Sequence, residues 1–450
     1  MNGLTIKNQK QNKIMTRNDF ESDYSRVVFS SAVRRLQDKA QVFPLESSGY
    51  VRTRLTHSIE VSSIARSLGV SVENRLISES KLDECYRGSL GAILATTGLI
   101  HDLGNPPFGH FGEAVIGEKF KSLFKENNYG LNTKEQEDFI QFDGNAQTLR
   151  YVMALHYMYD KEGENNGYDL TFATLASLIK YPRASDEIDK SRGLSYKKIG
   201  YFQSEAQKFE EIRKATGIGK SRHPLVFLLE AADDIAYMAA DVEDGFKKGV
   251  VSITQIRNYL SEFGNSEVVD KLNERLDINT KKSYYSRVNE HYPDQEELVI
   301  QWLRIDIQRT LIEAAIENFF SEYDAIMNGT LEIDLLKVGK GADLLEALKA
   351  LGRDFIYVEK NAMLKELAGA KAIEGLLDAF IQSSLDNESQ TYKSRVLNSL
   401  ISPNYRFINE HFPYKNSKEY NTFRLISDFI SGMTDSYVIE LFQKITGIKL

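Results

Sequence analysis

Cysteine is almost absent from this sequence: Cys85 is the single one among 450 residues. One cysteine excludes an internal disulfide framework and is typical of proteins that fold in a reducing compartment, so we expect a cytoplasmic protein. The first residues lack the apolar stretch of a signal peptide, and no uninterrupted apolar run approaches the length of a membrane span. We therefore expect no association with a membrane.

Positive charge is also in short supply, because 56 Lys and Arg residues face 64 Asp and Glu residues, for a net charge of −8. Proteins that bind duplex nucleic acid usually carry a basic excess, so such a partner is not expected. A small polyanionic substrate stays compatible with this balance, since it needs only a local group of cations. The sequence contains no phosphate-binding loop, no dinucleotide-binding fingerprint and no repeat of fixed period.

Proline is scarce as well, with 8 residues, and the sequence has no clear pair of alternating strands. Long stretches with apolar residues at helical spacing predict a mostly helical protein. Two segments are more polar: residues 181–222 resemble a loop-rich flap over a site, and residues 262–295 resemble a link between two helical lobes. The predicted helices cover residues 56–68, 90–100, 145–159, 170–180, 224–248, 296–328, 342–351, 359–383, 391–401 and 420–445.

Side chains that can bind a metal or transfer a proton are most concentrated in residues 101–113, HDLGNPPFGHFGE, which contain two histidines and two carboxylates. The apolar segment 90–100 precedes them and predicts a buried helix that ends at His101 and Asp102. Burying such a pair is unfavourable unless something pairs with it. A divalent metal ion is the simplest partner, because imidazole nitrogens and carboxylate oxygens both bind it.

Two other segments contain residues that suit the same ion. His57 opens an amphipathic helix, and Asp233 lies in a mostly apolar one, where Asp233, Tyr237 and Asp241 share a face at i, i+4 and i+8. Alone, His57 is more simply read as a cap or a surface residue, and the acidic stripe as a solvated face. Together with His101 and Asp102, His57 and Asp233 give four ligands for one ion of Mg, Mn, Zn, Fe or Co, with water and substrate oxygens completing the shell.

These motifs resemble those of a known family, the HD-domain deoxynucleoside triphosphate triphosphohydrolases, and most closely those of the bacterial deoxyguanosinetriphosphate triphosphohydrolases. The resemblance rests on Arg54-x-x-His57, on residues 101–113 and on residues 231–237 (AADDIAY). It extends to residues 142–147 (FDGNAQ), 179–182 (IKYP) and 427–435 (SDFISGMTD), and so covers the chain from Arg34 to its end.

The resemblance implies an all-α fold: an HD-domain helical bundle with an extended helical C-terminal lobe. It divides the chain into an N-terminal segment (1–30), an HD phosphohydrolase core (31–261) and a C-terminal lobe (262–450) that is continuous with the core. It also implies a homo-oligomer, a tetramer or a hexamer, with an allosteric nucleotide or single-stranded DNA as further partners.

The resemblance also implies a role for each site residue. We prefer Asp233 to Asp234 as a ligand because Asp233 shares its helix face with Tyr237 and Asp241. The implied set comprises the metal ligands His57, His101, Asp102 and Asp233; the catalytic pair His110 and Glu113; the phosphate contacts Arg54 and Lys180; the deoxyribose contacts Tyr237 and Asp241; and Gln41 and Val42 near the base and sugar.

The implied activity is metal-dependent hydrolysis of a deoxynucleoside triphosphate, with dGTP as the first candidate, by water attack on the α-phosphorus. The products are a deoxynucleoside and inorganic triphosphate, as for a phosphoric monoester hydrolase. His110 either protonates the leaving oxygen or positions the attacking water. Three alternatives stay open: a broader dNTP specificity, another HD-type nucleotide phosphohydrolase, or a regulator that senses nucleotides or binds single-stranded nucleic acid.

Overall fold

A computed structural model describes residues 18–46, 49, 51–156, 165–276, 295–385, 391–414 and 417–448. Helices make up most of these residues and none of them forms a strand, which confirms the predicted all-α fold. One isolated antiparallel bridge joins Ala40 to Thr53. None of the described helices combines the length and apolar character needed to span a membrane.

The first half of the described chain contains α1 (Asp19–Val28), α2 (Ser31–Arg35), α3 (Arg54–Ser78), α4 (Ser89–Ile100), α5 (Gly109–Glu126), α6 (Thr133–Ile140), α7 (Gly144–Met153), α8 (Phe172–Leu178) and α9 (Ala206–Thr216). The second half contains α10 (Pro224–Lys247), α11 (Ile253–Glu262), α12 (Ser266–Leu276), α14 (Gln295–Ser321), α15 (Tyr323–Met327), α16 (Ala342–Leu351), α17 (Lys360–Leu385), α18 (Tyr392–Leu400), α19 (Pro403–His411), α20 (Lys418–Ser431) and α21 (Asp435–Thr446).

Short helical turns connect several of these helices. A π-helical turn, η8 (Gly352–Ile356), follows α16 directly. The 3-10 turns are η1 (Leu36–Asp38), η2 (Glu84–Tyr86), η3 (Ser185–Glu187), η4 (Lys190–Arg192), η5 (Leu194–Tyr196), η6 (Gln203–Glu205) and η7 (Leu335–Lys337).

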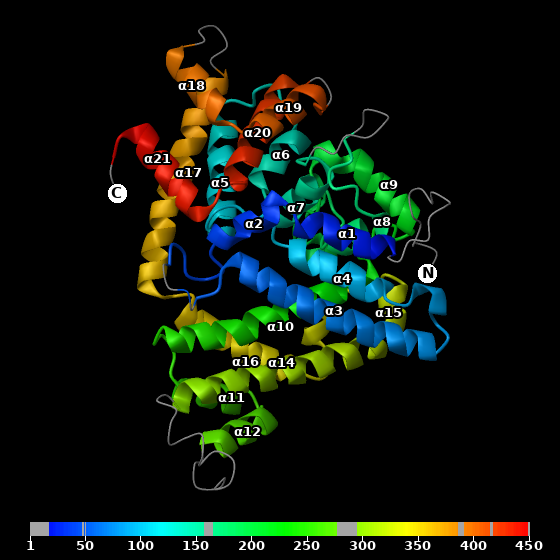
Figure 1. Cartoon of the computed structure of the whole chain (residues 1–450). Coiled ribbons are helices and arrows are strands. Elements are labelled where there is room, and N and C mark those ends of the chain that lie inside the picture. The colour runs from blue at the N-terminus through cyan, green and yellow to red at the C-terminus, as the bar shows by residue number, and fades with distance from the viewer. Residues whose placement is uncertain are drawn as a thin grey trace.

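The apolar side chains form two clusters, which correspond to the upper and lower halves of Figure 1. The lower cluster joins α3, α10, α11, α14 and α16, and the upper cluster joins α5 to α9 with α17 to α21. Helix α4 contributes to both: Ile93 belongs to the lower cluster, while Leu99 and Ile100 belong to the upper one. The end of α4, where His101 lies, is therefore at the junction of the two clusters.

Local signals fix the starts of the helices that lead into the site. Thr53 caps α3, since its side chain accepts a hydrogen bond from the Thr56 N–H while the Thr56 hydroxyl accepts one from the Thr53 N–H. His223 caps α10 through its ring Nδ1, which accepts a hydrogen bond from the Leu225 N–H, and Pro224 occupies the first helical position. These caps place Arg54 and His57 in the first turn of α3 and leave Asp233 in the middle of α10.

Several predicted helix boundaries are wrong. Residues 420–445 form two helices, α20 and α21, because the chain breaks at Gly432 and Thr434 caps a new helix. Helix α7 ends at Met153 rather than near residue 159. The loop-rich stretch 181–222 contains α9, and several of its side chains, including Arg183, are buried. This stretch is thus packed into the fold rather than lying loosely over it.

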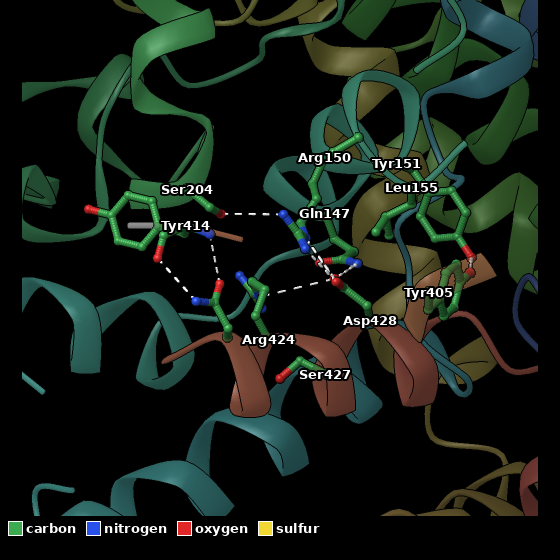
Figure 2. Close-up of polar contacts among 12 residues, drawn as sticks. Gln147, Arg150, Tyr151, Leu155, Ser204, Tyr405, Tyr414, Arg424, Ser427 and Asp428 are labelled. Carbon is green, nitrogen blue, oxygen red and sulfur yellow. Dashed lines mark hydrogen bonds and ion pairs between the residues drawn. The ribbon is translucent and has the colours of Figure 1, made fainter. Parts of the chain in front are cut away.

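A buried polar network fastens α20 to α7 (Figure 2). Asp428 is 2% exposed and accepts hydrogen bonds from Arg150 Nε at 2.8 Å and Gln147 Nε2 at 2.9 Å. Arg150 also contacts Glu205 at 2.6 Å, so its guanidinium lies between two carboxylates. Because α7 also carries residues that face the candidate site, this network links the C-terminal helices to the site.

Candidate active site

His101 lies at the C-terminal end of α4. One of its ring nitrogens forms a hydrogen bond, and within the described part of the chain the other does not. Its Nδ1 lies 2.8 Å from the carbonyl of Gly98 and therefore carries the hydrogen. Its Nε2 is buried and has no hydrogen-bond partner among the described residues. Burial alone lowers the pKa of His101, but the charges of Asp102 and Asp233 outweigh it and raise the pKa to about 9. The surroundings of Nε2 thus favour a positive charge, either a proton or a metal ion.

His57 and Asp233 lie on the same side of this free nitrogen. His57 Nε2 is 3.0 Å from Asp233 Oδ1, and His101 Nε2 is 3.5 Å from the same oxygen. One ligand atom from each of the three residues lies within 4.8 Å of the others. Although burial opposes it, the neighbouring histidines hold the pKa of Asp233 well below its usual value. Two imidazoles and a carboxylate at this spacing fit one divalent ion.

Asp102, the fourth predicted ligand, lies beside this cluster but has other partners. Its Oδ2 pairs with Arg54, and its Oδ1 accepts a hydrogen bond from Asn105 Nδ2 at 2.7 Å. That Oδ1 is 3.5 Å from His101 Nε2. The three-residue cluster therefore forms without Asp102, whose carboxylate lies at its edge.

His110 and Glu113 form a pair on the first turn of α5. Nδ1 of His110 is 2.8 Å from Glu113 Oε2, and the hydrogen bond raises the pKa of His110. The other oxygen of Glu113 accepts the N–H of Gly144 at 2.7 Å, and Lys198 Nζ lies 3.7 Å from Oε2. Burial opposes ionisation of Glu113, but His110 and these partners lower its pKa. The result is a fixed carboxylate that orients an otherwise exposed imidazole.

A cavity of about 450 Å³ brings most of the predicted site residues together. Lys180 is among them and lies 3.1 Å from Glu230. The predicted residues that line the cavity are Gln41, Val42, Arg54, His101, Asp102, His110, Lys180, Asp233 and Tyr237. His57, Glu113 and Asp241 do not line it. His57 instead contacts Asp233, and Glu113 contacts His110, and these two partners do line the cavity.

Asp241 is connected to the cavity through Tyr357. The Tyr357 hydroxyl donates to Asp241 Oδ2 at 2.7 Å, and the Tyr357 ring stacks on Tyr237 with 5.9 Å between centroids. Burial is the main cause that raises the pKa of Asp241 to about 8. Tyr237 and Tyr357 line the cavity, so two stacked rings form one of its walls.

Sequence reasoning missed four residues of this site. Tyr357 lies in a segment without a motif, and Lys198 is indistinguishable in the sequence from a solvated surface lysine. Asn105 lies inside the 101–113 run, where its position between Asp102 and His110 was an available signal. Thr148 accepts the N–H of Gly104 at 2.8 Å and donates to the carbonyl of His101 at 3.0 Å, which fixes the turn after α4.

Comparison with known proteins agrees with this geometry. Residues 54–162 match the HD domain, and residues 340–444 match a phosphohydrolase-associated domain. The first match covers α3 to α7, which carry His57, His101 and His110. HD domains are metal-dependent hydrolases, so the fold and the site define an enzyme of the hydrolase class.

The similarity to curated proteins extends over nearly the whole chain. A deoxyguanosinetriphosphate triphosphohydrolase-like protein of Listeria innocua is 43% identical, covering 96% of this chain and 94% of the relative. A protein with the same description from Synechocystis is 32% identical, covering 99% and 97%. The deoxyguanosinetriphosphate triphosphohydrolase of Salmonella paratyphi A is 31% identical, covering 96% and 94%. The chain belongs to this HD-domain triphosphohydrolase family, as its motifs indicated.

Proposed function

We propose that this enzyme hydrolyses a deoxynucleoside triphosphate, with dGTP as the first candidate, to a deoxynucleoside and inorganic triphosphate by water attack on the α-phosphorus. One observation carries the proposal: the His57–His101–Asp233 cluster and the His110–Glu113 pair meet at a single cavity of about 450 Å³. Relatives named for the same reaction support the choice of substrate.

The cluster would hold the metal ion. One ring nitrogen each of His57 and His101 and a carboxylate oxygen of Asp233 would be the donors, and the unpartnered Nε2 of His101 is the observation that fits an ion best. When bound, a divalent cation neutralises charge on the phosphate oxygens and increases the acidity of water. Asp102 supports the site by holding Arg54 at its edge.

His110 is suited to donate a proton to the leaving 5′ oxygen. An alkoxide is a poor leaving group, and a general acid in hydrogen-bond reach accelerates its departure. The hydrogen bond and the charge of Glu113 raise the pKa of His110 and so favour its protonated form. We assign proton transfer to His110, orientation and charge stabilisation of its ring to Glu113, and positioning of Glu113 to Lys198 and the Gly144 N–H.

The remaining cavity residues would bind the substrate. Arg54 and Lys180 supply positive charge for the triphosphate in a protein that is acidic overall. Tyr237, with Tyr357 stacked on it, provides a flat wall for the deoxyribose. Gln41 has a buried Oε1 without a hydrogen-bond partner among the described residues, which suits a donor on the sugar or base.

Product analysis tests this proposal. The purified chain is incubated with each of the four dNTPs and with Mg²⁺, Mn²⁺, Zn²⁺, Fe²⁺ or Co²⁺ in turn, and inorganic triphosphate, pyrophosphate and phosphate are resolved. We expect triphosphate and deoxynucleoside in equal amounts with at least one metal. Release of pyrophosphate with a monophosphate, or of phosphate with a diphosphate, would instead indicate another HD-type phosphohydrolase.

A further inference from the structure

Asp435, the first residue of α21, is a buried carboxylate shared by two segments of the site. It is 2% exposed. Its Oδ1 accepts the backbone N–H of Phe108 at 2.9 Å, and its Oδ2 accepts the backbone N–H of Ala40 at 2.8 Å. Phe108 comes two residues before His110, and Ala40 comes directly before Gln41. One side chain from the C-terminal helices thus fixes the backbone beside a catalytic residue and beside a substrate-binding residue.

The hydrogen bond from the Phe108 N–H to Asp435 holds a residue with an unusual backbone conformation. Phe108 has φ +61° and ψ +19°, the left-handed region that residues with a Cβ rarely adopt. Helix α5 begins at the next residue, Gly109, so the conformation of Phe108 sets the direction of the turn that carries His110. A bulky residue stays in this conformation when the surrounding structure holds it there, and the carboxylate of Asp435 is in position to do so.

The bond to Ala40 acts on the segment that enters α3. Ala40 forms the isolated antiparallel bridge with Thr53, and the N–H of Arg54 donates to the carbonyl of Lys39 at 2.9 Å. Gln41, which lines the cavity, follows at once. A displacement of Ala40 would therefore move Gln41 and the start of α3 together.

Lys39, the residue before Ala40, forms further hydrogen bonds that connect this segment to the turn after α4 and to the end of α20. Its ammonium group is buried and donates to the carbonyl of Asn105 at 2.5 Å and to that of Ser431 at 2.9 Å. Asn105 in turn donates to Asp102 at 2.7 Å. Burial lowers the pKa of Lys39 to about 7 and raises the pKa of Asp435, and the attraction between the two groups opposes both shifts.

We propose that Asp435 is a positioning residue for the reaction proposed above, and that it sets the placement of His110 and Gln41 through its two backbone hydrogen bonds. The inference rests on the proposed function for its kinetic consequence. A carboxylate suits this role because each oxygen accepts one N–H. An amide at the same place accepts one N–H and presents its own donor to the other.

The test uses the full chain with Mn²⁺ and dGTP, and compares wild type, Asp435→Asn and Ser436→Ala. Ser436 is a matched control, because it is the next residue of α21 and its hydroxyl donates to the exposed Asp38, at 2.7 Å. We expect Asp435→Asn to lower kcat per Mn²⁺-binding chain by about 10- to 100-fold, as small displacements of catalytic groups do. KM should rise as Gln41 shifts, while Ser436→Ala keeps both parameters.

A purely structural role gives a different result. If Asp435 only stabilises the fold, activity falls in proportion to the chains that still bind Mn²⁺, with KM unchanged, and the proposal is overturned. If Asp435→Asn does not fold, Asp435→Ser, which brings no opposing amide donor, replaces it in the comparison.

Hydrogen–deuterium exchange gives a second readout that does not depend on turnover. We expect faster exchange in peptides that cover residues 39–44 and 105–112 of Asp435→Asn, with the peptides of α10 unchanged. Unaltered exchange in both segments overturns the proposal even if the wild-type chain releases no triphosphate. A wild-type chain that releases no triphosphate would refute the proposed function but not this inference.

Discussion

His101 and His110 differ in what their Nδ1 atoms face, and this difference divides their roles. His101 donates to the neutral carbonyl of Gly98, which leaves Nε2 facing the carboxylate of Asp233. His110 faces the carboxylate of Glu113, and its side chain is 78% exposed. A carboxylate partner stabilises the imidazolium, whereas a carbonyl mainly fixes the ring. The buried histidine therefore suits a ligand and the exposed one a proton donor.

Glu113→Gln tests the coupling within the catalytic pair. The pair raises the pKa of His110, so the protonated form persists to higher pH and is lost as pH rises through that raised pKa. The glutamine variant lacks the stabilising charge, and we expect kcat to fall about 10²-fold or more, with its decline at high pH beginning at a lower pH. Binding of dGTP should persist. The measurement is a kcat profile against pH.

The control for this variant is Glu118→Gln, on the same helix and exposed to solvent. It should reproduce the wild-type profile. If Glu113→Gln also reproduces it, Glu113 has no part in the reaction.

The site could be predicted from the sequence to the level of residue types but not of side-chain partners. Motif spacing singled out His57, His101 and Asp233, and the structure places their ligand atoms within 4.8 Å of each other. The partners of Asp102 depend on how its carboxylate is oriented at the end of α4, and spacing contains no such information. Asp435 ends the segment 427–435 that carries part of the resemblance, but its partners could not be predicted, because the two backbone groups it binds lie 327 and 395 residues away along the chain.

At the scale of elements, apolar spacing predicts where helices lie better than where they end. The segment 342–351 matches α16 at both ends, because Gly341 and Gly352 flank a clear apolar stripe. The segment 420–445 was predicted as one helix because apolar residues continue at helical spacing through the break. The side chain of Thr434 accepts the N–H of Tyr437 and so starts a new helix, whose first residue, Asp435, is buried.

The contact between α7 and α20 gives a prediction about stability. Asp428→Ala leaves Arg150 with Glu205 as its remaining carboxylate and leaves Gln147 Nε2 without its acceptor. Removing one partner of a buried charged network is strongly destabilising, and we expect a loss of about 3 kcal/mol in the free energy of unfolding. Chemical denaturation monitored by circular dichroism measures it.

Lys444→Ala is the matched control, because it removes an exposed pair with Glu440 on α21. It should change the free energy of unfolding by less than about 1 kcal/mol. Equal effects of the two substitutions would show that the buried network contributes no more than a surface pair.

In the whole molecule, buried side chains of the C-terminal helices α17 to α21 share one apolar cluster with those of α5 to α9. Phe380 of α17 and Phe423 and Ile430 of α20 belong to the same apolar cluster as Phe120 of α5. Figure 1 shows α17, α20 and α21 beside α5 and α6 in the upper half of the molecule. The helix that carries His110 and Glu113 is thus packed against residues from the far end of the chain.

Truncation after Leu385 tests this arrangement. It removes α18 to α21 and exposes the apolar surfaces of α5, α6 and α17, so we expect a chain without cooperative thermal unfolding that binds a hydrophobic dye. A chain truncated after Thr446, which loses only the last four residues, should unfold like the full chain. A cooperative transition in the shorter chain would show that the N-terminal helices fold on their own.

We propose that His57, His101 and Asp233, which lie far apart in the chain, hold one metal ion beside His110. Calorimetric titration of the metal-stripped protein with Mn²⁺, run in parallel on wild type, His101→Ala and His110→Ala with turnover of dGTP recorded on the same samples, tests it most directly. We expect a single ion per wild-type chain, loss of both binding and turnover in His101→Ala, and binding without turnover in His110→Ala. Wild-type affinity for Mn²⁺ in His101→Ala would contradict this proposal.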